Sequence, residues 1–134
     1  MKKINTPTVK VGTDVCHIHR IKLAYEKFGK RFLEKILTTR EMKYVISNKK
    51  NLIHRLAGLY AAKEALSKVL GTGLNGIYFR EIEIVRETSG APKVRLNKRA
   101  LIRAKKIGLQ NFDVSISHDE NFAIAVAAGV IVKF

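Results

Sequence analysis

The alternation of apolar and polar residues near the start of the chain predicts a β-strand over residues 9–18. Successive side chains of a strand point to opposite faces, so residues two apart share a face. One face carries Val9, Val11, Thr13 and Val15. Asp14 therefore lies opposite the apolar face, together with Lys10, Gly12 and Cys16.

Helical spacing of apolar residues dominates the segments that follow. It runs from Ile21 to Leu37, although Gly29 weakens the middle, so one bent helix or two short ones fit. Thr38 and Glu41 form a capping box that predicts a short helix through about residue 46, followed by a polar break at 48–51. The pattern over 52–70 predicts the longest helix, which Gly71 terminates.

The second half of the chain is mostly strands. Residues 77–86 predict a strand whose apolar parity switches near Arg80, which suggests a bulge. A turn at Ser89-Gly90 leads into a hairpin arm over 92–96, and Asn97 caps a further helix. Two more strands follow over 112–118 and 122–132. Because helices cluster early and strands late, we predict an α+β fold in a single domain over residues 1–134.

The charge of the chain limits its choice of partner. The 26 Lys and Arg residues exceed the 11 Asp and Glu residues, which gives a net charge of +15. This charge favours an anionic partner such as nucleic acid, a phosphorylated ligand, a membrane surface or an acidic protein, and it equally fits solvated surface lysines. The aromatic residues are not interleaved with the basic ones, and no nucleic-acid-binding motif is present, so we expect no nucleic-acid partner.

The cysteine content and the longest apolar run indicate the compartment. Cys16 is the only cysteine, which excludes an internal disulfide and a paired-cysteine zinc site and favours a reducing environment. The first residues lack the apolar core of a secretory signal. The apolar run at 122–132 is shorter than the roughly 20 residues that a membrane-spanning helix needs. We therefore expect a cytoplasmic protein with no membrane contact.

The stretch AAKEALSKVLGTG at 61–73 is the most informative for chemistry. Glu64 and Lys68 lie one turn apart on one helix face, which is also typical of a simple surface ion pair. Alternatively, Glu64 offers an oxygen ligand to Mg²⁺ while Lys68 neutralises a phosphate held beside the metal. Asp14 is the candidate for a second carboxylate ligand, although it also fits a carboxylate that faces water at a strand edge.

Other polar residues leave a structural and a functional interpretation open. His118 ends the segment SISH and fits either a phosphate or ribose contact or a structural hydrogen bond. His17 and His19 lie two apart on the predicted strand, share a face and are interpreted as surface. The basic residues of the next segment fit a solvated face or a docking surface for an acidic helix or a phosphate backbone; they are Arg20, Lys22, Lys27, Lys30 and Arg31, with Lys35 and Arg40 beyond them.

Six motifs, taken in order, resemble the holo-acyl-carrier-protein synthases of the 4′-phosphopantetheinyl transferase superfamily. They are GTDVCHIHRI (12–21), KRFLEKILTTRE (30–41), AAKEALSKVLGTG (61–73), FREIEI (79–84), GAP (90–92) and SISH (115–118). The resemblance spans nearly the whole chain. It implies an α+β fold in the order β-α-α-α-β-β-α-β-β, which agrees with the order that the residue pattern predicts.

The resemblance also implies a reaction and a set of site residues. The reaction is Mg²⁺-dependent transfer of 4′-phosphopantetheine from coenzyme A to a serine of apo acyl carrier protein, with release of 3′,5′-ADP, in support of fatty acid biosynthesis. Asp14, Glu64 and Lys68 would be catalytic, with Asp14 and Glu64 as the Mg²⁺ ligands and Glu64, through a water, as the candidate general base. The implied coenzyme A contacts are Lys63, Lys68, Gly71, Gly73, Pro92, Ser117 and His118.

Further implications concern partners and assembly. Arg20 and Arg31 match family arginines that meet the acidic helix of the carrier protein. The resemblance also implies a homotrimer with active sites between subunits, so we expect a homotrimer. The acidic carrier protein and anionic coenzyme A also give the net charge of +15 a role, since opposite charges steer encounter.

The sequence departs from the family pattern at two positions. The family commonly has Arg at the position of Leu59, just before the aromatic of its R-F-A-x-K-E-A stretch, so a phosphate contact is missing here. Arg55 lies one turn earlier on the same face, and our hypothesis is that it substitutes in binding coenzyme A. The second departure is Phe79, where many relatives carry Trp.

Two other functions fit parts of the sequence. A small RNA-binding or ribosome-associated domain without catalysis explains the charge, but not Asp14, Glu64 or the ordered motifs. A broad-specificity phosphopantetheinyl transferase that serves larger synthases fits less well, because the resemblance implies a longer, two-lobed chain for that type.

Overall fold

The structure is a computed structural model that describes residues 6–132. Its α+β architecture confirms the predicted fold class, with four α-helices after the first strand where the sequence left three or four open. The elements in chain order are β1 (Thr8–His17), α1 (Ile18–Phe28), α2 (Lys30–Ile36), α3 (Thr39–Ile46), η1 (Lys49–Asn51), α4 (Leu52–Val69), η2 (Phe79–Glu81), β2 (Ile82–Arg86), β3 (Pro92–Leu96), α5 (Lys98–Ile107), β4 (Leu109–His118) and β5 (Phe122–Ile131).

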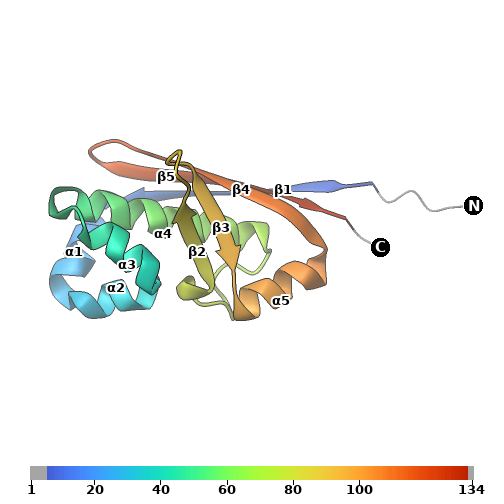
Figure 1. Ribbon diagram of the computed structural model, residues 1–134, viewed down its shortest axis with the longest axis horizontal. Helices are drawn as coiled ribbons and strands as arrows, with labels where there is room; N and C mark the ends of the chain where they lie inside the picture. The colour runs from blue at the N-terminus through green and yellow to red at the C-terminus, as the bar shows by residue number, and fades with distance from the viewer. Residues whose placement is uncertain (1–5, 133–134) are drawn as a thin grey trace, which may run out of the picture.

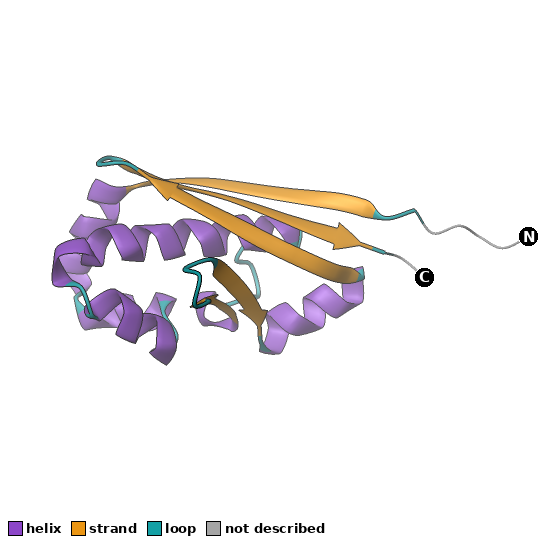
Figure 2. Cartoon of the chain, turned by 45° about the horizontal axis from the view of Figure 1, so that its top comes forward, coloured by secondary structure: helices purple, strands orange, loops and turns teal. Residues whose placement is uncertain are grey.

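Three long strands form one antiparallel sheet in the order β1-β5-β4, while β2 and β3 form a separate hairpin. The helices lie on one side of this sheet, with α4 running along it (Figures 1 and 2). Helices α1, α2 and α3 gather at one end of α4, and α5 lies toward the other end (Figure 1). None of the helices in residues 6–132 is long and apolar enough to cross a membrane.

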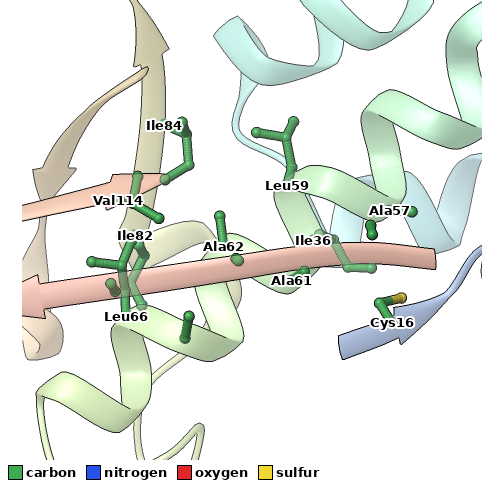
Figure 3. Packing of buried hydrophobic residues seen from close by; sticks show 14 of the residues in the cluster. Cys16, Ile36, Ala57, Leu59, Ala61, Ala62, Leu66, Ile82, Ile84 and Val114 are labelled. Carbon is green, nitrogen blue, oxygen red and sulfur yellow. The ribbon is translucent and has the colours of Figure 1, made fainter. Parts of the chain in front are cut away.

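Small residues let α4 lie close to the sheet. The inward side chains of β5 are alanines without solvent exposure, and α4 meets them with further alanines and a glycine; these residues are Ala123, Ala125, Ala127, Ala57, Gly58, Ala61, Ala62 and Ala65. Figure 3 shows Ala61 and Ala62 where the helix passes the strand. The approach is closest at Gly12 of β1, where an added Cβ would lie 2.0 Å from the carbonyl oxygen of Ala65. Only glycine permits this contact.

The other sides of α4 are buried by the helical end and the hairpin. Larger side chains fill this second layer of the core, including Ile36, Leu59, Leu66, Ile82, Ile84 and Val114 (Figure 3). Because α4 is covered on nearly every side, it carries buried residues all round rather than on a single stripe. The helix therefore forms the centre of the molecule and fixes the positions of the polar side chains that it carries.

The outer face of the sheet is apolar and exposed. Val9, Val11 and Val15 of β1 retain 60–64% of their surface, and Ile124 and Val126 of β5 also lie on this face. The apolar face of β1 is therefore not the face that packs on the core. The opposite face, with Gly12, Asp14 and Cys16, lies against α4 because small side chains allow the closer contact.

Gly29 divides the first predicted helical segment in two. Its φ of 57° and ψ of −132° are not helical, and its N–H donates to the carbonyl of Tyr25 at the end of α1. Two short helices therefore form instead of one bent helix. The predicted capping box is confirmed, since Thr38 accepts from the Glu41 N–H and the Glu41 carboxylate accepts from the Thr38 N–H.

Three local predictions are wrong. The parity switch near Arg80 marks a 3₁₀ turn, η2, rather than a bulge. His17 and His19 do not share a strand face, because β1 ends at His17 and α1 begins before His19. Asn97 precedes α5 but makes no side-chain capping bond; the buried carboxylate of Glu81 accepts from the Ala100 N–H instead.

Candidate functional site

A cavity of about 370 Å³ brings residues of β1, α1 and α4 together. Asp14 of β1 and Glu64 of α4 both line it, as do Cys16 and Tyr60. Arg20, in the first turns of α1, lies at the same cavity. Two carboxylates far apart in the sequence therefore face one space, as expected for a pair of metal ligands.

The close contact at Gly12 explains how Asp14 reaches α4. Because β1 touches the backbone of Ala65 there, Asp14, two residues further along the same face, lies beside the next turn of the helix. Lys68 completes the contact: its Nζ lies 3.7 Å from Oδ1 of Asp14 and donates to the carbonyl oxygen of Thr13. In the described residues, the ion pair of Lys68 is thus with Asp14 rather than with Glu64.

The two carboxylates raise the proton affinity of the site. Partial burial raises the pKa of Asp14, and the nearby Lys68 only partly offsets this. Burial, and then the charge of Asp14, raise the pKa of Glu64, while Lys68 and the nearby Tyr60 hydroxyl partly offset the rise. The site therefore holds more negative charge than Lys68 neutralises, and a bound cation would relieve the repulsion between the two carboxylates.

The ligands at this site suit Mg²⁺ better than a metal ion that takes all of its ligands from protein side chains. In the part of the chain that the structure describes, no cluster of three or more His, Cys, Asp and Glu side chains is placed to hold a metal ion. Asp14 and Glu64 provide two hard oxygen ligands, which suits Mg²⁺ because this ion keeps several waters and binds substrate phosphates. Cys16 is no alternative nucleophile, since burial and the two carboxylates raise the pKa of its thiol to about 11.

Comparison with known proteins identifies the family. The sequence profile described as "4′-phosphopantetheinyl transferase superfamily" matches residues 10–127. The chain belongs to this superfamily. It is 43% identical over 119 residues to a holo-[acyl-carrier-protein] synthase of Gloeobacter violaceus, a match that covers 89% of this chain and 90% of that one. This likeness makes the chain a phosphopantetheinyl transferase of the holo-[acyl-carrier-protein] synthase group.

Solved structures agree with this assignment. The holo-[acyl-carrier-protein] synthase of Neisseria meningitidis superposes with a TM-score of 0.81 at 32% identity, covering 90% of this chain and 96% of that one. The enzyme of Helicobacter pylori, solved in complex with coenzyme A, superposes with a TM-score of 0.76 at 34% identity, covering 92% and 99%. This phosphopantetheinyl transferase therefore has the same fold as solved holo-[acyl-carrier-protein] synthases.

Lys63 does not lie where the sequence prediction put it. Its side chain has no solvent exposure, and its ammonium donates to the carbonyl oxygens of Ile36 (2.6 Å) and Phe79 (3.1 Å) and to Oε1 of Glu41 (2.6 Å). All three N–H groups are thus used inside the protein. The prediction that Lys63 contacts the phosphates of coenzyme A is wrong for this arrangement, because no donor is left for a phosphate.

Arg55 is turned toward the end of α3. Its guanidinium donates to the carbonyl of Tyr44 (2.6 Å) and to the hydroxyl of Ser47 (3.1 Å), and it lies over the Tyr44 ring at 4.2 Å from the ring centre. Arg86 of the hairpin lies over the same ring. Arg55 does not line the carboxylate cavity. Its contact with coenzyme A stays a prediction.

The remaining predicted contacts with coenzyme A lie apart from the carboxylate pair within one chain. Gly71 and Gly73 form the loop after α4, both with positive φ. Pro92 begins β3, at the hairpin. Ser117 and His118 end β4, at the opposite edge of the sheet from Asp14, and the His118 ring lies 5.5 Å from that of His54. None of these residues lines the carboxylate cavity, although Gly71 lines a neighbouring pocket together with Lys68.

The two arginines predicted to meet the carrier protein are both exposed. Arg20 borders the carboxylate cavity, whereas Arg31 lies on α2. Neighbouring lysines pair with glutamates on their own helices, Lys22 with Glu26 and Lys30 with Glu34. Within residues 6–132, neither arginine forms such an ion pair. The charge of Arg20 nevertheless acts on the cavity, where it partly offsets the rise in the pKa of Cys16.

Sequence reasoning missed Tyr60 as a residue of the site. It lines the cavity together with Glu64, one turn away on α4. The available signal was its position four residues before Glu64, which places the two side chains on the same face of a helix.

Proposed function

We propose that this phosphopantetheinyl transferase moves the 4′-phosphopantetheine group from coenzyme A to a serine of apo acyl carrier protein, with Mg²⁺ bound by Asp14 and Glu64. The observation that carries the proposal is the placement of these two carboxylates on one cavity beside Lys68. In a phosphoryl-transfer site, two carboxylates and bound phosphates provide the ligand set that Mg²⁺ favours. Bound Mg²⁺ would polarise the diphosphate and stabilise its developing charge.

Each step of the proposed transfer can be matched to residues of the chain. The serine oxygen forms a bond to the β-phosphorus of coenzyme A as the bond between that phosphorus and the bridging oxygen breaks, and 3′,5′-ADP leaves. Glu64, through a water, is the proposed acceptor of the serine proton. Lys68 offsets the negative charge that grows on the leaving phosphate.

The basic end of the molecule suits an acidic carrier protein. Arg20 borders the cavity, and Arg31 lies on the neighbouring helix, both exposed and without an ion-pair partner in the described residues. A carrier protein that binds these arginines would present its serine near Asp14 and Glu64. We place the reaction in the cytoplasm, in support of fatty acid biosynthesis.

We also propose that the chain is a homotrimer with active sites between subunits. Two observations support this: the predicted coenzyme A contacts are divided within one chain, and the outer face of β1 and β5 exposes large aliphatic residues, Val9, Val11, Val15, Ile124 and Val126. Exposed apolar patches commonly mark interfaces. Sedimentation of a Val11→Lys variant should show a smaller particle, whereas the matched variant Ile102→Lys, on exposed α5, should keep the size of the unmodified chain.

Intact mass spectrometry of an apo acyl carrier protein tests the reaction. Incubation with the enzyme, coenzyme A and Mg²⁺ should add the mass of phosphopantetheine to the carrier protein. EDTA or Asp14→Ala should abolish the gain, while Lys105→Ala on α5 should leave it intact. No gain with several carrier proteins, together with steep salt-dependent RNA binding, would favour the non-catalytic alternative.

A further inference from the structure

Tyr60 is held rigidly at the wall of the carboxylate cavity. Its ring centre lies 5.1 Å from that of Phe79 in η2, with 32° between the ring planes. The side chain is half-buried between α4 and this turn. Because a packed aromatic ring has few accessible rotamers, the position of its hydroxyl is fixed as well.

The Tyr60 hydroxyl is placed to donate to Glu64. The two residues lie one turn apart on α4 and both line the cavity, so the Tyr60 hydroxyl lies within reach of the Glu64 carboxylate. A phenol is protonated at neutral pH, so the hydroxyl is the donor and the carboxylate the acceptor. Lys68, one turn further along, is directed to Asp14 and to the carbonyl of Thr13.

A glutamate side chain needs such a contact to hold one orientation. It has three rotatable bonds, and a partly exposed glutamate samples several rotamers unless a partner restrains it. Asp14, in contrast, is shorter and is restrained by Lys68. The restraint on Glu64 therefore determines whether the two carboxylates face the same point in the cavity.

We infer that Tyr60 is a positioning residue that holds the Glu64 carboxylate in the orientation in which Glu64 and Asp14 together bind a divalent cation. The inference rests on the proposed Mg²⁺ site and adds a residue outside the ligand set. Hydrogen bonds to metal ligands commonly change metal affinity by about 10–100-fold.

Tyr60→Phe tests the role of the hydroxyl, because it keeps the ring and its contact with Phe79. Binding of Mn²⁺, a paramagnetic ion that also prefers carboxylate oxygens, is measured by electron paramagnetic resonance in the complex with coenzyme A and without carrier protein. We expect Tyr60→Phe to bind Mn²⁺ about 10-fold more weakly, while its melting temperature without metal stays close to that of the unmodified chain. Tyr78→Phe, which removes the hydroxyl of an exposed tyrosine, should leave Mn²⁺ affinity unchanged.

The Mg²⁺ dependence of turnover provides a second readout. The Mg²⁺ concentration for half-maximal rate should rise in Tyr60→Phe, whereas kcat at saturating Mg²⁺ should recover. Equal or tighter Mn²⁺ binding in Tyr60→Phe would overturn the positioning role and leave the proposed metal site standing. An unmodified chain that binds no Mn²⁺ in the coenzyme A complex would overturn both.

Discussion

The buried ion pair between Lys63 and Glu41 joins five elements of the fold and predicts a large loss of stability when it is broken. Lys63 of α4 bonds to the end of α2, to Glu41 of α3 and to η2, while the second carboxylate oxygen of Glu41 accepts from the N–H of Ile84 in β2. Neither charged side chain is exposed. Lys63→Met keeps most of the side-chain volume and leaves the Glu41 carboxylate buried without its counter-ion.

The size of the effect follows from burial and chain length. Removing one partner of a buried ion pair costs about 3–5 kcal/mol. With an unfolding entropy of about 2.1 cal/mol/K per residue over 134 residues, 1 kcal/mol corresponds to about 3.6 °C in melting temperature. We therefore expect Lys63→Met to lower the melting temperature by about 11–18 °C. Lys105→Met, at an exposed lysine, should change it by about 2 °C or less.

Chemical denaturation of a double-mutant cycle measures the interaction directly. The cycle comprises Lys63→Met, Glu41→Gln and the combination, with the free energy of unfolding determined for each. Because the double variant removes both charges, its loss of stability should be smaller than the sum of the single losses by about 2 kcal/mol or more. Additive losses, or a drop of less than about 4 °C in Lys63→Met, would refute the claim that the buried charges depend on each other.

Three further predictions concern the site. Glu64→Gln should raise the melting temperature of the metal-free protein at neutral pH. Because the pKa of Glu64 is raised, the folded state holds this proton more tightly than the unfolded state, so its contribution to stability is present at low pH and is lost as the pH rises above about 4.5. A Glu64→Gln protein that gains no stability between pH 4 and 7 relative to the unmodified chain contradicts this. Gly12→Ala should abolish most transferase activity, since its Cβ would lie 2.0 Å from the Ala65 carbonyl and must displace Asp14 with β1; activity within twofold of normal would show that the strand does not need this contact. Arg55→Ala should raise the KM for coenzyme A about 10-fold if Arg55 leaves Tyr44 for a phosphate; an unchanged KM restricts Arg55 to its contacts with α3.

Local signals in the sequence were sufficient for much of the fold. The capping box of Thr38 and Glu41 and the helix ended by Gly71 depend on neighbours within one turn, and both are confirmed. The hairpin arm after Ser89-Gly90 is confirmed for the same reason. Gly29 left two alternatives, because a glycine inside an apolar helical pattern fits both a continuous and a divided helix.

Long-range packing decided what the sequence did not show. Lys63 lies next to Glu64 in a motif of charged residues, and nothing local indicates that Glu41, twenty-two positions earlier, buries its ammonium. The valines of β1 predicted an apolar face but not which side would meet the helix. That choice depended on the fit of Gly12 against Ala65, which the sequence of either element alone does not contain. Asp14 and Glu64 were identified as a pair from the sequence, whereas Tyr60, although one helical turn from Glu64, was recognised only from the cavity that both residues line.

The strand order β1-β5-β4 places the last described strand in the middle of the sheet. Thr8 pairs with Ile131 and His17 with Phe122. Both edge strands, β1 and β4, therefore lack their pairing partner until β5, the last described element, has been synthesised. Helices can form earlier because their contacts are local, but the alanine surface that receives α4 does not exist until β5 is inserted. During synthesis, β1 therefore remains without a partner strand, and Asp14 gains its opposite residue, Ala125, only when β5 has been added to the sheet.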